Sequence, residues 1–167
     1  MIVTRNNLDS VLQHLGKQTT LSLDSETTGL RPYHGDRLFS LAIAAPGPWA
    51  GMNVATFYFN FKGYPGLDEA QILLPEHMAL LRNLLEKDNC LWFLHNAKFD
   101  IAMLKAEGIT LGGDIHCTQA MARVIRNDYF TYSLADCAEG IGHKKDGAVE
   151  DYIDKHHLWE WMSRPGK

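Results

Sequence analysis

The stretch LSLDSETTGL, residues 21 to 30, places two carboxylates at the end of an apolar run. Its alternating apolar and polar residues are typical of a β-strand, and Gly29 marks the turn that follows. Because successive side chains of a strand point to opposite sides, Asp24 and Glu26 should project together. Two like charges on one side raise each other's pKa unless a cation lies between them. The stretch therefore predicts a buried strand with a paired carboxylate site at its end.

A divalent metal ion would relieve this repulsion. Hard carboxylate oxygens suit magnesium or manganese. A D-x-E pair also occurs where a strand end frays into solvent and both side chains are hydrated. The pair alone leaves these two interpretations open.

A second buried strand runs into a helix in LWFLHNAKFD, residues 91 to 100. Asn96 and Asp100 are four residues apart and should share a helix face, with Asn96 as the cap and Asp100 in the first turn. Capping chemistry alone would explain this pair. If the two strands are parallel neighbours, however, both stretches end at the same sheet edge, where open α/β sheets bind ligands.

The remaining pattern predicts a mixed α/β sheet in which three consecutive strands form an antiparallel meander and later strands join through helical crossovers. Strands are expected over residues 19–26, 37–45, 54–61, 90–96 and 112–117, with a break over 46–53. Helices are expected over residues 6–17, 75–88, 97–108, 118–127, 133–142 and 149–162.

Composition indicates one domain over residues 1–167. The chain is 46% hydrophobic and 22% charged, which allows a sizeable core. The net charge of −4 gives no sign of nucleic-acid binding, but a metal-assisted phosphate site needs local carboxylates rather than a basic surface. The three cysteines contain no CxxC pair, which argues against structural zinc or a disulfide framework.

Nothing in the chain predicts a leader or a membrane span. The N-terminus lacks the apolar core of a signal peptide, and no run approaches about 18 apolar residues. We expect a soluble, cytoplasmic protein with no membrane partner.

DSETTGL (residues 24–30) and NAKFD (residues 96–100) resemble the first two motifs of the DEDD 3′–5′ exonucleases, D-x-E-T-x-x-L and N-x-K-x-D. The likeness is closest to the proofreading domain of family-A DNA polymerases and covers roughly residues 18 to 145. It implies a ribonuclease H-like fold and hydrolysis of the 3′-terminal phosphodiester of single-stranded DNA.

The resemblance also implies roles for individual residues. Asp24, Glu26 and Asp100 match carboxylates that hold two Mg²⁺ or Mn²⁺ ions. Four further residues match positions beside the 3′-terminal nucleotide, with the leucine wedged against its base: Thr27, Leu30, Asn96 and Phe99.

The family's fourth carboxylate lies on a late helix, a few residues after a tyrosine or histidine that orients water. Tyr132 and Asp136 fit Y-x-x-x-D by count, but they precede the place where this motif is due. We therefore expect the chain, which ends at Lys167, to be the N-terminal part of an exonuclease domain, incomplete at its C-terminus. By itself it should have little or no activity.

The resemblance implies a polymerase domain beyond this chain, and the short N-terminus suggests a phage-type enzyme acting in the host-cell cytoplasm. Two alternatives stay open. One is an RNA-processing 3′–5′ exonuclease of the same superfamily. The other is a non-catalytic module that binds nucleic acid.

Overall fold

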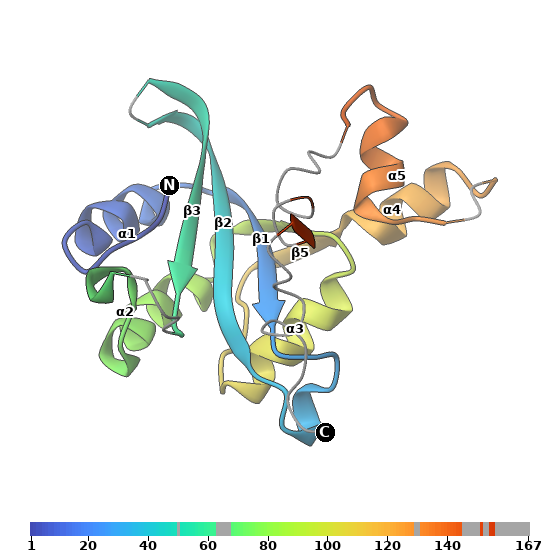
Figure 1. Ribbon diagram of the computed structural model, residues 1–167. Helices are drawn as coiled ribbons and strands as arrows, with labels where there is room; N and C mark the ends of the chain where they lie inside the picture. The colour runs from blue at the N-terminus through green and yellow to red at the C-terminus, as the bar shows by residue number, and fades with distance from the viewer. Residues whose placement is uncertain (50, 63–67, 129–130, 145–150, 152–153, 156–167) are drawn as a thin grey trace.

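The computed structural model describes residues 1–49, 51–62, 68–128, 131–144, 151 and 154–155 (Figure 1). The helix expected over residues 149–162 falls largely outside this part of the chain. The elements, in chain order, are α1 (Leu8–Gly16), β1 (Thr20–Thr27), the 3₁₀ helix η1 (Pro32–His34), β2 (Leu38–Trp49), β3 (Met52–Asn60), the 3₁₀ helix η2 (Glu69–Gln71), α2 (Pro75–Leu85), β4 (Leu91–Leu94), α3 (Ala97–Ala106), β5 (Asp114–Cys117), α4 (Thr118–Ile125) and α5 (Leu134–Glu139).

The sheet has the strand order β3-β2-β1-β4-β5. β1, β2 and β3 form an antiparallel meander, and β4 and β5 join β1 in parallel. The predicted mixed sheet is therefore confirmed. Because β1 and β4 are parallel neighbours, the two polar stretches end at the same edge of the sheet, as the sequence indicates.

One face of the sheet forms the hydrophobic core. Along β1, Leu21 and Leu23 are buried, whereas Asp24 and Glu26 lie on the opposite, accessible side. The same alternation continues in β2 and β3, and the buried residues pack with α1, α2 and α3 in one cluster. Full burial of one such Leu or Phe contributes about 1.5–3 kcal/mol, so this face fixes the register that directs the carboxylates outward.

The expected break over residues 46–53 is wrong. β2 runs on to Trp49 and β3 begins at Met52, so the two strands extend beyond β1 as a two-stranded ribbon (Figure 1). The last residue of β2 paired with β1 is Ala44, so Pro46 pairs only with β3 and its missing N–H interrupts no bond to β1. A register shift between Pro46 and Trp49 accommodates the glycine and prolines.

No helix among the described residues is both long enough and apolar enough to cross a membrane.

Candidate active site

Asp24 and Glu26 lie near the carboxyl end of β1, on the side of the sheet away from the core. Partial burial raises the pKa of both side chains, and the negative charge of Asp24 raises the pKa of Glu26 further. Each carboxylate is thus less stable as an anion than it would be in water. A bound cation would reverse both effects, because it stabilises the ionised forms.

Asp100 approaches β1 from α3 and is only 2% exposed. Its Oδ1 accepts hydrogen bonds from the Ser25 backbone N–H, at 3.1 Å, and from the Ser25 hydroxyl, at 2.5 Å. Ser25 stands between Asp24 and Glu26 but points to the buried side of the strand. Burial raises the pKa of Asp100 to about 6; the Ser25 hydroxyl opposes this shift, and the charge of Asp24 adds to it.

Asn96 occupies the N-cap of α3, and Asp100 lies in the first turn, as predicted. The Asn96 side chain, however, makes no capping hydrogen bond, and the Asn96 backbone is left-handed, with φ 60° and ψ 44°. Asparagine tolerates this conformation, which turns the chain sharply from β4 into α3. The expected common helix face does not form, because Asn96 is exposed while Asp100 is buried.

The other expected substrate contacts lie close to these carboxylates in the chain. The Thr27 hydroxyl donates to the Gly29 carbonyl, at 2.8 Å, so this side chain organises the turn after β1. Leu30, in the loop after β1, is 80% exposed. Phe99, on α3, is half-buried.

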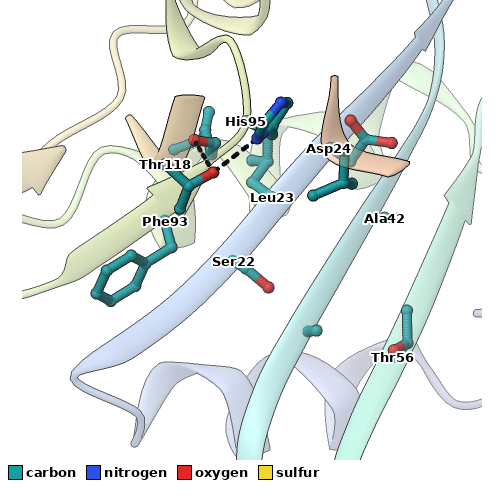
Figure 2. A pocket seen from close by; sticks show the side chains of 11 residues that line it. Ser22, Leu23, Asp24, Ala42, Thr56, Phe93, His95 and Thr118 are labelled. Carbon is teal, nitrogen blue, oxygen red and sulfur yellow. Dashed lines mark hydrogen bonds between the residues drawn. The ribbon is translucent and has the colours of Figure 1, made fainter. Parts of the chain in front are cut away.

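A pocket of about 310 Å³ opens beside Asp24, on the side of the sheet away from the core (Figure 2). Its floor consists of short side chains from three adjacent strands, including Ser22, Ala42 and Thr56. His95 and Thr118 lie at its rim. The volume is at the lower end of the range for small-ligand pockets, about 300–1,000 Å³, so a ligand group can reach Asp24 from this side.

His95 joins the end of β4 to the following helices. Its Nε2 lies 2.8 Å from the Tyr132 carbonyl and must donate, while Nδ1 lies 2.9 Å from the Thr118 hydroxyl. His95 is therefore a hydrogen-bonding residue at the end of the strand. Its charge, when protonated, also lowers the pKa of Asp24 and favours that carboxylate's ionised form.

Tyr132 and Asp136, the weakly supported candidates for a third motif, make local contacts. The Tyr132 hydroxyl donates to the Arg126 carbonyl, at 2.6 Å. The exposed Asp136 carboxylate accepts from the hydroxyls of Thr131 and Ser133, and Ser133 caps α5 by accepting the Asp136 N–H. The contacts of Asp136 therefore belong to the cap of α5.

The donor chemistry of the three carboxylates fits Mg²⁺ or Mn²⁺, since both ions prefer oxygen ligands. The charge coupling of Asp24 to Glu26 and to Asp100 places all three within electrostatic reach. Within the described residues, however, no group of three or more His, Cys, Asp or Glu side chains is arranged to hold a metal ion. Because Ser25 engages Oδ1 of Asp100, joint binding requires the other Asp100 oxygen or release of Ser25.

Sequence reasoning missed two residues of this region. Ser25 tethers Asp100, and Tyr58 of β3 places its hydroxyl 2.6 Å from the Ser40 hydroxyl. Burial raises the pKa of Tyr58, and the charge of Glu26 contributes to the increase. The Ser25–Asp100 and Tyr58–Ser40 contacts depend on strand register and helix placement, which cannot be predicted from a local pattern of residues.

Comparison with known proteins gives a family match. Residues 1–146 match a family model described as 3′–5′ exonuclease. A search of curated protein sequences found no match.

Several solved structures are similar in fold. NrnC of Brucella melitensis with bound Mg²⁺ has a TM-score of 0.56 and 23% identity, covering 78% of this chain and 57% of that one. The RNase domain of yeast Pop2 has a TM-score of 0.64 and 16% identity, covering 86% and 76%. The POL domain of Pol1 from M. smegmatis, in complex with DNA primer-template and dNTP, has a TM-score of 0.65 and 21% identity, covering 89% and 23%.

At these identities the likeness concerns the fold, and it confirms the expected ribonuclease H-like sheet. The chain spans little more than half the length of NrnC.

Proposed function

The chain belongs to the 3′–5′ exonuclease family, and from that premise we propose that it supplies the proofreading exonuclease of a family-A DNA polymerase. The carboxylate arrangement carries the proposal. Asp24 and Glu26 share the open face of the sheet beside a pocket, and Asp100 is tied to the same strand through Ser25. The D-x-E-T-x-x-L and N-x-K-x-D motifs and the similarity to Pol1 favour DNA as substrate.

In this proposal Asp24, Glu26 and Asp100 hold Mg²⁺ or Mn²⁺. When bound, a pair of such ions activates a water molecule and stabilises the leaving 3′ oxygen. The raised pKa values of the three carboxylates mean that protons compete with metal ions for them, most strongly at Asp100. Burial outweighs the opposing effect of a positive charge on His95, so the pKa of Asp24 stays raised and a bound cation would favour its ionised form.

The substrate strand would meet the site at the loop that follows β1. Exposed Leu30 would contact the terminal base through its apolar surface, a type of contact that does not depend on the identity of the base. Thr27, Asn96 and Phe99 would lie around the same nucleotide. The pocket beside Asp24 gives the reacting end of the strand room on the open face of the sheet.

Incubation with 5′-labelled single-stranded DNA and RNA of one sequence, with Mg²⁺ or Mn²⁺, tests the proposal. We expect slow shortening from the 3′ end that a 3′ block prevents, faster on DNA than on RNA. Asp24→Ala should abolish it. Asp88→Ala, an exposed carboxylate in the loop before β4, should leave it unchanged.

An RNA-processing exonuclease is the second candidate, and the similarity to the RNase domain of Pop2 favours it. Faster shortening of the RNA would establish this alternative. Oligonucleotide binding without hydrolysis, unchanged by Asp24→Ala, would instead indicate a non-catalytic module. Asp136→Ala should have no effect, because the Asp136 carboxylate belongs to the cap of α5; loss of hydrolysis in that variant would give Tyr132 and Asp136 the third-motif role.

A further inference from the structure

Asp36 is a buried carboxylate that the proposed chemistry does not use. It is 6% exposed, and its Oδ2 accepts the Arg31 backbone N–H at 2.7 Å. In return the Asp36 N–H donates to the Arg31 carbonyl, at 3.4 Å. The Arg31 guanidinium, itself largely exposed, comes only to 4.0 Å. Because a buried charge is costly without fixed partners, these backbone bonds define where the carboxylate sits.

Gly29 gives the Asp36 carboxylate the space it occupies. A Cβ added at Gly29 would lie 2.6 Å from the Asp36 carboxyl carbon and from both of its oxygens. The backbone at Gly29 does not have a positive φ, so the requirement here is for space and not for an unusual conformation. The Asp36 side chain therefore packs directly on the Gly29 backbone.

Two further bonds close the loop at its base. The Thr28 N–H donates to the Arg37 carbonyl, at 2.9 Å, and the Arg37 N–H donates to the Thr28 hydroxyl, at 2.8 Å. The Arg37 side chain also reaches Glu107, at the end of α3, at 3.8 Å. The loop is thus held against the helix that carries Asp100.

Leu30 stands between the two residues that Asp36 immobilises. Gly29 contacts the Asp36 carboxylate and Arg31 is hydrogen-bonded to it, while the Leu30 side chain remains 80% exposed. The loop therefore presents an apolar side chain to solvent on a fixed backbone. This geometry reduces the entropy that would be lost when Leu30 meets a ligand.

We propose that Asp36 is a positioning residue, which fixes the backbone on both sides of Leu30 and so holds that side chain ready for the 3′-terminal base. The inference rests on the proposed function, because it takes Leu30 as a substrate contact. It adds that affinity for the strand end depends on a buried carboxylate that touches neither substrate nor metal.

Fluorescence anisotropy with the full chain tests this inference. The probe is a 5′-labelled single-stranded DNA whose 3′-terminal linkage is a phosphorothioate, which slows hydrolysis. Leu30→Ala and Asp36→Ala should each raise the Kd roughly five- to tenfold. The double variant should bind no worse than Leu30→Ala, because Asp36 acts through Leu30.

Two further variants separate positioning from general stability. Leu84→Ala removes a buried side chain of α2 in the core and should lower the melting temperature without changing the Kd. Asp36→Asn keeps an oxygen acceptor for the Arg31 N–H and should bind more tightly than Asp36→Ala. If Asp36→Ala does not fold, Asp36→Asn is compared with Leu30→Ala in the same double-variant scheme.

Wild-type affinity in Asp36→Ala, multiplicative effects of the two substitutions, or no effect of Leu30→Ala would each overturn the inference. Failure of the proposed function looks different, because it is faster shortening of RNA than of DNA, or shortening or binding that Asp24→Ala leaves unchanged. Either result can occur without the other.

Discussion

At the level of single residues, Ser25 connects β1, which carries Asp24 and Glu26, to Asp100 on α3. Its neighbours Asp24 and Glu26 point to the open face of the sheet, while its own hydroxyl and N–H hold Asp100 beneath the strand. β1 thus carries two acidic side chains on one side and binds the third on the other. Burial in this position raises the pKa of Asp100 to about 6, although the Ser25 hydroxyl opposes the shift, and the raised pKa has a measurable consequence.

We expect the metal-free protein to lose stability as pH rises from about 4 to about 6. The pKa of Asp100 is raised from 3.8 to about 6 in the fold, so the folded state binds more protons than the unfolded chain across this interval. The stabilisation is complete below the lower value and is lost as pH rises through the upper one. Urea unfolding in EDTA at several pH values measures it.

Asp100→Asn is the control for this pH dependence. The free energy of unfolding of Asp100→Asn should fall less steeply as pH rises. The raised pKa values of Asp24 and Glu26 should leave a residual decrease. An unchanged slope in Asp100→Asn would show that the burial of Asp100 has no part in the effect.

Gly29→Ala should destabilise the fold by about 1–3 kcal/mol, because the new Cβ would overlap the Asp36 carboxylate. In the Asp36→Ala background the same substitution should cost much less, since the overlapping atoms are gone. Chemical unfolding of the four proteins in this double-mutant cycle measures the coupling free energy between positions 29 and 36. Equal costs in both backgrounds would contradict the packing of Asp36 on Gly29.

At the level of elements, the ends of β1 and β4 position the site. β1 delivers two carboxylates, and the left-handed Asn96 turns β4 into α3 so that Asp100 falls in the first turn. His95 then fixes the start of α4, through Thr118, and the segment before α5, through the Tyr132 carbonyl. Gln119 donates to the same carbonyl, at 3.1 Å, so two side chains share this attachment.

His95→Ala should loosen α5 selectively. It removes a side-chain bond to the Tyr132 carbonyl, so we expect faster hydrogen exchange of the α5 amides and little change in those of the sheet. His34→Ala, at the exposed 3₁₀ helix η1, is the matched control and should leave α5 unaffected. Unchanged α5 exchange in His95→Ala would mean that His95 does not hold this segment.

Element boundaries show which features could be predicted from the sequence. The alternation in β1 and the apolar run of β4 depend on local patterns, and the structure confirms both strands. The extension of β2 through Pro46 could not be predicted, because it depends on the pairing of strands. Pro46 lies beyond the part of β2 that pairs with β1 and pairs only with β3. The conformation of Asn96 is likewise set by the angle between strand and helix, since Asn suits both caps and left-handed turns.

At the level of the whole molecule, the sheet separates an apolar core from a face that carries the candidate chemistry (Figures 1 and 2). The sequence predicts that the two motifs meet at one edge, because parallel strands align their carboxyl ends. It does not predict that Asp100 lies beneath β1 on Ser25, or that Asp36 packs on Gly29. The first contact forms when α3 packs against β1, and the second forms when the loop after β1 closes. Neither contact follows from the local pattern of residues in the sequence.

Calorimetric titration of the protein with Mn²⁺ at pH 7.5 tests the central claim most directly, namely that Asp24, Glu26 and Asp100 are metal ligands. Most of the Asp100 carboxylates are ionised at this pH, so protons should not mask the site. We predict binding by the wild type, its loss in Asp24→Ala and in Glu26→Ala, and its retention in Asp88→Ala. Absence of binding by the wild type, or equal binding by wild type and Asp24→Ala, would contradict the account.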